Sequence, residues 1–397
     1  MKYDFTTIMD RAGHDAIAVD DIPIPGARVK DGFSRLPMWV ADMNFPTLPS
    51  ILDAMEERLK HHHFGYFNLS DAYFNGIMNW HKERFGVTGM TREDIGYENG
   101  VLGCVSASIQ AFTAPGDAVL LHSPTYIGFT KTIENIGRNI ILSDLKLDEN
   151  NVWRMDYEDM EKKLKENKVH CAVFCSPHNP TGRVWEREEL ERAMELYQKY
   201  DCVVISDEIW ADLTLPGHTH IPLQTISEDA KNRTISVYAP SKTFNLAGLI
   251  GSYHVIYNSY LRDRIGKVSA ASHYNSCNVL SMHALTGAYS REGMEWVDEL
   301  RQVLADNVEY AYGFINSHFK GVKLAKPQGT YMLFLDCEEW LKEHQKSLDE
   351  LLRAGVEVGV IWQDGRAFHG KYSIRVNLAL PHALVEEAFD RLDKYVF

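Results

Sequence analysis

The sequence predicts an α/β fold, in which a large doubly wound domain with a mainly parallel sheet is joined to a smaller α+β domain. Three observations support it: the length, a series of short apolar runs separated by helical patterns, and a change of pattern after about residue 290. The chain has 397 residues, which is more than one hydrophobic core usually supports. Its hydrophobic fraction of 45% and charged fraction of 24% are typical of globular proteins.

The predicted strands are short runs of apolar and β-branched residues without polar alternation. Such runs suit strands that are covered on both faces, as in a parallel sheet. Most are separated by stretches with helical periodicity, such as residues 187–201, which is the order expected of a doubly wound sheet. The runs are AVLLH (118–122), CAVFCS (171–176), CVVISD (202–207), TISVY (234–238) and YHVIY (253–257).

The second domain is predicted from the pattern at the two ends of the chain. Residues 290–319 form one long helix with an apolar stripe that contains Val297, Leu300, Leu304, Val308, Ala311 and Ile315. Short strands and helices follow it, whereas the N-terminal stretch is rich in Pro and Gly. We therefore expect a cofactor-binding domain over 45–289 and a small domain formed by 1–44 and 290–397.

Charge and composition exclude several classes of protein. The net charge is −14 and the basic residues are scattered, which disfavours a nucleic-acid or an anionic membrane partner. The first residues lack an apolar signal segment and no run is long enough to span a membrane, so a cytoplasmic protein is expected. Neither the C-x3-C pair at Cys171 and Cys175 nor the run His61–His63 has the spacing of metal ligands, and we expect no metal site.

Three polar residues stand at the ends of predicted strands, where ligands bind in open α/β sheets. Asp207 ends the run VVISD, where a carboxylate either caps a helix or pairs with a positive group. Lys242 lies in APSKTFNLAG, either as a solvated residue or as an amine whose pKa is lowered by burial. Asn179 lies in SPHNPTGR, where Asn-Pro by itself indicates only a turn.

A fourth segment, NGVLGCVSASIQAF (99–112), begins a helix with a glycine. The free backbone N–H groups of a helix start suit a phosphate, although this motif is weak by itself. Neither a P-loop nor a complete G-x-G-x-x-G fingerprint occurs in the chain, which removes two common nucleotide-binding classes.

Taken together, SPHNPTGR, SDEIW, APSKTFNLAG and SIRVNLA resemble the class I/II aminotransferase-like superfamily of fold-type I pyridoxal-phosphate enzymes. The similarity extends over nearly the whole chain. The segments MWVADMNF (38–45), FGY (64–66) and SPHNP resemble its C–S β-lyase branch, the cystathionine β-lyases and cystalysin-like enzymes.

The resemblance implies pyridoxal 5′-phosphate (PLP) as cofactor and assigns the site residues. Lys242 would carry it as a Schiff base, Asp207 would face the pyridine nitrogen, Asn179 would bind the phenolic oxygen and Tyr126 would stack on the ring. The phosphate would be held by Gly100, Val101, Leu102 and Ser241, and by Tyr66 from the neighbouring subunit of a homodimer with shared sites. Arg375, with Asn179, would bind the substrate carboxylate.

Two positions depart from the pattern of many transaminases. Trp210 stands where these enzymes have a tyrosine three residues after the aspartate, and Ile250 stands where they have a phosphate-binding arginine. The lyase branch also lacks that arginine, although histidine is its common residue at the Trp210 position.

The implied activity is β-elimination on cystathionine or another L-cysteine S-conjugate, which gives a thiol, pyruvate and ammonia. Transamination of an amino acid is the alternative, because the two reactions share their first steps. A regulatory protein on the same fold is disfavoured, since both Lys242 and Asp207 are present.

Overall fold

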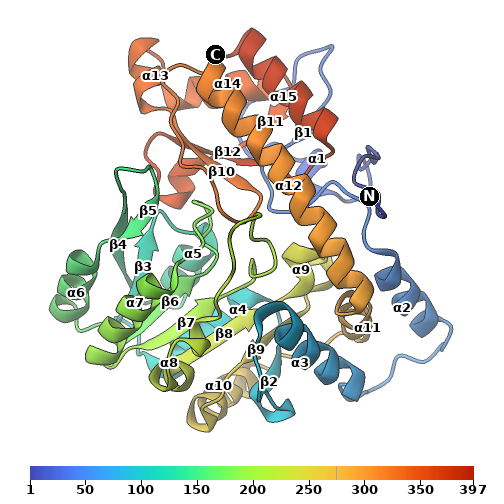
Figure 1. The fold of residues 1–397 in the computed structure, drawn as a ribbon, viewed down its shortest axis with the longest axis vertical. Coiled ribbons are helices and arrows are strands. Elements are labelled where there is room, and N and C mark those ends of the chain that lie inside the picture. Colours follow the sequence, from blue (N-terminus) through green and yellow to red (C-terminus); the bar gives the residue numbers. More distant parts are fainter. Residues whose placement is uncertain (274) are drawn as a thin grey trace.

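The computed structural model describes residues 1–273 and 275–397. An eight-stranded sheet forms its larger part, with the strand order β2-β9-β8-β7-β6-β3-β4-β5 (Figure 1). The four central pairings, from β4 through β3, β6 and β7 to β8, are parallel, and the pairings at both edges are antiparallel. The strands are β2 (Ile95–Glu98), β3 (Ala118–Ser123), β4 (Asn139–Leu147), β5 (Trp153–Met155), β6 (Cys171–Cys175), β7 (Val203–Asp207), β8 (Thr234–Tyr238) and β9 (Ser252–Val255). The predicted mainly parallel sheet is therefore confirmed.

Helices cover both faces of this sheet. One core cluster joins its central strands to α4 (Val101–Phe112), α5 (Ile127–Asn135) and α10 (Ser259–Ser272). A second cluster joins the opposite face to α6 (Tyr157–Glu166), α7 (Arg187–Lys199) and α8 (Glu228–Arg233). This is the doubly wound arrangement that the uniformly apolar strands predicted.

The predicted long helix is α12 (Arg291–His318), and every residue of its predicted apolar stripe is buried. Ser290 caps its start, where the side-chain oxygen accepts a hydrogen bond from Gly293 N at 3.1 Å. The helix runs from the neighbourhood of α2 and α11 toward the C-terminal elements (Figure 1). The other helices are α1 (Ile17–Asp20), α2 (Pro49–Leu59), α3 (Asp71–Phe85), α9 (Pro240–Thr243), α11 (Val279–Ala288), α13 (Glu338–Glu343), α14 (Leu348–Glu357) and α15 (His382–Tyr395).

The two ends of the chain form two smaller sheets. β10 (Met332–Asp336), β13 (Ser373–Asn377) and β12 (Gln363–Asp364) make an antiparallel sheet, whereas β1 (Leu36–Pro37) pairs in parallel with β11 (Val360–Ile361). The N-terminal segment thus contacts the C-terminal elements, as expected. The domain boundaries at 44/45 and 289/290 stay a proposal. Among the described residues, no helix is long and apolar enough to cross a membrane.

Candidate active site

One cavity lies at the carboxyl ends of the parallel strands and collects most of the predicted site residues. Asp207 closes β7, Lys242 follows β8, Asn179 follows β6 and the start of α4 forms another wall. Because these strands are parallel neighbours, their ends meet at the same edge of the sheet. The predicted residues that line the cavity are Gly100, Val101, Leu102, Tyr126, Asn179, Asp207, Ser241 and Lys242.

The Lys242 amine is held inside this cavity on the short helix α9. Its Nζ donates a hydrogen bond to the backbone oxygen of Ala41 at 2.8 Å. Burial and the nearby Arg375 cation lower the pKa of Lys242 to about 8, while Asp42 and Asp207 oppose the shift. About one-tenth of this amine is therefore uncharged at pH 7 and about half at pH 8, and the uncharged form is the one that a nucleophilic lysine requires.

Asp207 provides a buried carboxyl group across the same cavity, and only 5% of the residue is exposed. Burial raises its pKa to about 7, although a hydrogen bond from Ile209 N at 3.1 Å and the charge of Lys242 both lower it. A buried carboxyl group with so little compensation is suited to a cationic ligand group, which would lower its pKa again.

Arg375 lies beside the cavity on β13 and is linked to it through Asn179. Its Nη1 donates to Asn179 Oδ1 at 3.2 Å and its Nη2 donates to Trp39 O at 2.9 Å, while its guanidinium lies 4.3 Å from the ring of Phe368. Burial lowers the pKa of Arg375 to about 10, so the group remains charged at neutral pH. A buried guanidinium of this kind is a site for a carboxylate.

The start of α4 has the backbone geometry of an anion site. Gly100 precedes the helix with a φ of 84°, a left-handed value that favours glycine over any other residue. The first N–H groups of a helix have no partner within the helix, and α4 begins at Val101 with its N-terminus at the cavity. Ser241 adds a hydroxyl to the cavity wall.

Besides Arg375, which lies beside the cavity, Tyr66 is the predicted site residue that does not line it. Its side chain is fully exposed, and its neighbours Phe64 and Phe67 are 58% and 39% exposed. Within one chain, Tyr66 contributes nothing to the site.

The two residues that depart from the transaminase pattern, Trp210 and Ile250, both line the cavity. The buried Trp210 ring lies 5.9 Å from Lys242 Nζ and packs edge-on against Tyr331 at 4.8 Å. Ile250 lines the cavity beside Gly100 and is 51% exposed. Its φ of 49° is unusual for a β-branched residue.

The segment 39–42 contributes backbone groups that sequence reasoning missed. The carbonyl groups of Trp39 and Ala41 accept hydrogen bonds from Arg375 and Lys242, and those of Val40 and Asp42 accept from Asn377 Nδ2 at 2.7 and 2.6 Å. The motif MWVADMNF was visible, but its acceptors are main-chain atoms, which carry no residue-specific signal.

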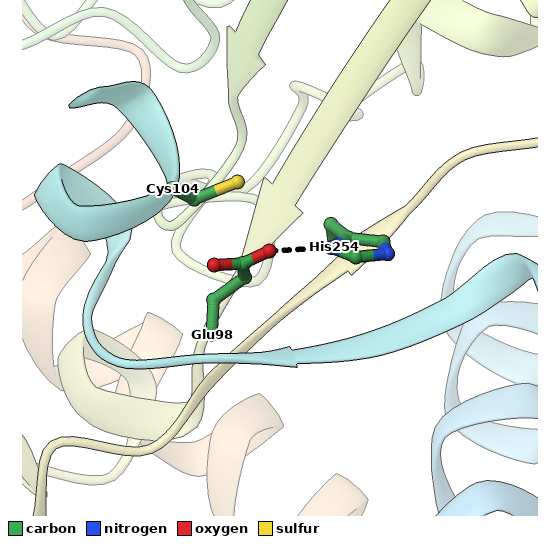
Figure 2. Close-up of side chains that lie close together, drawn as sticks. All are labelled: Glu98, Cys104 and His254. Atoms are coloured by element: carbon green, nitrogen blue, oxygen red, sulfur yellow. Dashed lines mark hydrogen bonds and ion pairs between the residues drawn. The ribbon is translucent and has the colours of Figure 1, made fainter. Parts of the chain in front are cut away.

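Three side chains form a polar cluster near the start of α4: Glu98 on β2, Cys104 on α4 and His254 on β9. Their polar atoms lie within 4.8 Å of one another (Figure 2). Glu98 Oε1 and His254 Nδ1 are 2.6 Å apart, whereas two ligands of one tetrahedral zinc ion lie about 3.3 Å apart. The Cys104 thiol lies beside this pair and contacts Ser108 Oγ at 3.8 Å, and Asn275 Nδ2 donates to the second carboxylate oxygen of Glu98 at 3.3 Å. The Glu98–His254 hydrogen bond therefore joins β2 to β9 beside the first turn of α4, which carries Cys104.

The fold and the cavity define an α/β enzyme built around a buried lysine amine. The chain belongs to the aminotransferase class I and II family, whose sequence profile matches residues 39–392.

Two curated relatives cover nearly the whole chain. The chain is 33% identical over 360 residues to cystathionine beta-lyase PatB of Bacillus subtilis, covering 90% of this chain and 91% of that protein. It is 30% identical over 394 residues to protein MalY of Escherichia coli, covering 97% and 96% of the two chains.

Two solved structures extend the comparison. A PLP-bound putative aminotransferase of Clostridium difficile 630 has a TM-score of 0.90 and 32% identity, with 100% of both chains covered. Cystalysin of Treponema denticola, which contains PLP, has a TM-score of 0.88 and 29% identity, with 99% of this chain and 98% of that chain covered.

Proposed function

We propose that the protein is a PLP-dependent C–S lyase that acts on cystathionine or other L-cysteine S-conjugates. The observation that carries the proposal is the buried Lys242 amine, with its pKa lowered to about 8, in one cavity with Asp207. Support also comes from the relatives, among them a cystathionine beta-lyase and cystalysin.

The residues of the cavity fit this cofactor. A phosphorylated pyridine aldehyde needs an amine for its aldehyde, an acid for its ring nitrogen, an aromatic face and N–H groups for its phosphate. Lys242, Asp207, Tyr126 and the start of α4 offer these groups in turn, with Ser241 as a further phosphate donor. Asn179 would bind the phenolic oxygen.

The proposed reaction begins with the substrate carboxylate on Arg375, whose fixed contacts to Asn179 and Trp39 set its orientation. When bound, the pyridine ring of PLP accepts the electron pair that remains on the substrate Cα after that carbon loses its proton. Asp207 holds a proton on the ring nitrogen and so keeps the ring electron-poor.

Lys242 Nζ, once released from the cofactor, takes the proton from the substrate Cα. The thiolate then leaves Cβ and is protonated. Hydrolysis of the remaining three-carbon unit consumes one water molecule and gives pyruvate and ammonia.

The experiment is incubation of the purified protein with L-cystathionine and a panel of cysteine thioethers, with pyruvate and free thiol measured. We expect equal amounts of both from at least one compound, and none with Lys242→Ala. No pyruvate from any of the thioethers would contradict the proposal.

Aminotransferase activity is the second candidate, because the 32%-identical structure is described as a putative aminotransferase. Transfer of the amino group to an added 2-oxo acid, without thiol release, would favour it. Trp210 and Ile250, at positions where many transaminases have tyrosine and arginine, disfavour it.

We further propose a cytoplasmic homodimer with shared sites, in which Tyr66 reaches the phosphate of the partner subunit's cofactor. The full exposure of Tyr66, together with the exposed Phe64 and Phe67, supports this assignment, because aromatic side chains are rarely left in water as a group. A subunit interface would cover them.

A further inference from the structure

The short helix that carries Lys242 is followed by an asparagine with a left-handed backbone. This helix, α9, ends at Thr243. Leu246 N donates to Ser241 O at 3.0 Å, which closes the helix end around Asn245. Asn245 has a φ of 58°, a value that glycine adopts at no steric cost and that asparagine tolerates better than most residues. Glycine would suffice for this turn, so the presence of asparagine points to a role for its side chain.

The side-chain amide of Asn245 makes two hydrogen bonds to the backbone of Met43. Its Oδ1 accepts from Met43 N and its Nδ2 donates to Met43 O, both at 2.9 Å and across 202 positions of the chain. Met43 is buried, with 1% of its surface exposed. Arg11 Nη1 also donates to Met43 O, at the longer distance of 3.3 Å. The amide of Asn245 therefore fixes Met43 against the end of α9.

The residue held in this way is two positions from Ala41, whose backbone oxygen accepts the hydrogen bond from Lys242 Nζ at 2.8 Å. On β13, Asn377 Nδ2 donates to the carbonyl groups of the residues on both sides of Ala41. Two asparagine side chains therefore hold this stretch of chain. Asn377 ties it to the small sheet, whereas Asn245 ties it to the element that carries the amine.

The Ala41 carbonyl matters most when the Lys242 amine is charged. In the proposed reaction Lys242 Nζ takes the proton from the substrate Cα and becomes an ammonium group. Burial disfavours that charge, as the lowered pKa of Lys242 shows. An acceptor that is already in place stabilises the charge while it develops, so it speeds proton transfer without strengthening substrate binding.

We propose that Asn245 is a positioning residue that keeps the Ala41 carbonyl aligned with Lys242 Nζ while the amine removes the substrate proton. The inference deepens the proposed function and rests on it only in taking Lys242 as a base that acts on an amino acid. Asn245 does not line the cavity and acts through the backbone of Met43. In the sequence it follows the lysine as an ordinary turn residue, which predicts no such role.

The test compares the PLP-loaded wild-type enzyme with Asn245→Gly, because glycine keeps the left-handed helix end and removes only the amide. Both are incubated with L-alanine in D2O, and exchange of its Cα hydrogen is followed by NMR. L-alanine has no leaving group, so exchange reports proton removal alone. We expect the exchange rate at saturation to fall about fivefold or more, and up to about 100-fold if the hydrogen bond to Ala41 is lost entirely. The half-saturating concentration should change less than about twofold, because Arg375 remains held by Asn179.

The matched control is Thr47→Val. It removes another hydrogen bond between the same two stretches of chain, from Thr47 Oγ1 to Phe244 O at 3.0 Å, and leaves the amide of Asn245 in place. Its exchange rate should stay within about twofold of the wild type. Equal losses in the two variants would indicate a general loosening of this junction and would overturn the inference, as would an unchanged rate in Asn245→Gly.

Cofactor content separates positioning from a loss of the whole site. The imine absorbance of Asn245→Gly at saturating PLP should equal that of the wild type, and a variant unable to hold PLP would overturn the inference. If the wild type exchanges the Cα hydrogen of L-alanine but releases no pyruvate from thioethers, the lyase assignment fails and the test of Asn245 stands. A wild type that exchanges no amino acid of a panel would reject Lys242 as the base and this inference with it.

Discussion

Arg375 Nη1 donates a hydrogen bond to Asn179 Oδ1 at 3.2 Å, although the two residues are 196 positions apart in the chain. Asn179 follows a strand of the large sheet, whereas Arg375 lies on β13 of the small antiparallel sheet. The contact fixes the direction of a planar guanidinium, so the proposed carboxylate site would select for the orientation of a carboxylate as well as for its charge.

The substitution Arg375→Lys tests this requirement. An ammonium group keeps the charge but loses the planar arrangement of donors, so we expect KM for the amino-acid substrate to rise by about 10- to 100-fold, the equivalent of one or two charge-assisted hydrogen bonds. Steady-state kinetics measures it, with cofactor absorbance as the control for an intact site. An unchanged KM would show that Arg375 does not bind the substrate.

Cofactor attachment should depend on pH through Lys242. Only the neutral amine attacks an aldehyde, and burial together with Arg375 lowers the pKa of Lys242 to about 8. The rate of imine formation after PLP is added to the cofactor-free protein should rise with pH and level off above about 8, with about a tenfold lower rate at pH 7. Absorbance at the imine band follows the reaction. A lysine derivative with blocked α-groups serves as the reference, and its rate of imine formation should level off above about pH 10.4. The same midpoint in the protein would show that the pKa of Lys242 is not lowered.

Three buried histidines should make the protein sensitive to acid. Burial lowers the pKa of His81 and His178 to about 3 and that of His122 to about 4. In the unfolded chain a histidine takes up a proton at about pH 6.5. The stability that the three neutral histidines contribute to the folded state is therefore fully present above that pH and is lost as the pH falls toward 4. Relative to pH 7, the protonation of each of these histidines in the unfolded chain should lower the free energy of unfolding at pH 5 by roughly 2 kcal/mol.

Denaturant titrations between pH 5 and 7 measure this dependence. His122→Gln removes one titrating group, and its stability should fall less steeply with decreasing pH than that of the wild type. Identical slopes would mean that His122 is not held neutral.

The shared-site dimer predicts complementation between two inactive variants. Lys242→Ala lacks the amine, and Tyr66→Ala lacks the proposed contact to the partner's phosphate. A hybrid dimer would contain one intact site, so a mixture refolded at equal concentrations should recover up to about a quarter of wild-type activity, because half of the dimers are hybrids and each has one working site. Activity no higher than the sum of the separate variants would contradict a site that spans two subunits.

Glu98 should support cofactor binding without touching the cofactor. Glu98→Gln replaces a carboxylate that accepts from His254 at 2.6 Å and that lies within 4.8 Å of the Cys104 thiol in the first turn of α4. We expect a loss of about 1–3 kcal/mol in the free energy of unfolding and a weaker affinity for PLP, measured by equilibrium dialysis. Cys104→Ala, which removes the neighbouring thiol and leaves the Glu98–His254 hydrogen bond in place, is the matched control and should have the smaller effect on stability.

The sequence was most informative for the buried strands. The apolar runs at 171–176, 202–207 and 234–238 coincide with β6, β7 and β8, because strands covered on both faces need apolar residues throughout. β4, which lies next to the edge strand β5, alternates polar and apolar residues over its exposed half, and no such run marks it.

The site was predictable where a side chain has a motif of its own, as at Asp207 and Lys242. The contact of Ala41 could not be read from the sequence, because it uses a main-chain oxygen 201 residues from Lys242. The role of Tyr66 stays a prediction, because within one chain its side chain meets only solvent.

The carbonyl groups of residues 39–42 hold Lys242, Arg375 and Asn377 from a stretch that belongs to neither the large sheet nor the long helix. A fragment trimmed to begin at Phe45 would keep every strand of the large sheet, yet it would lack the acceptor for the lysine amine and one support of the arginine. Such a fragment could fold around its own core and still be unable to turn over an amino acid.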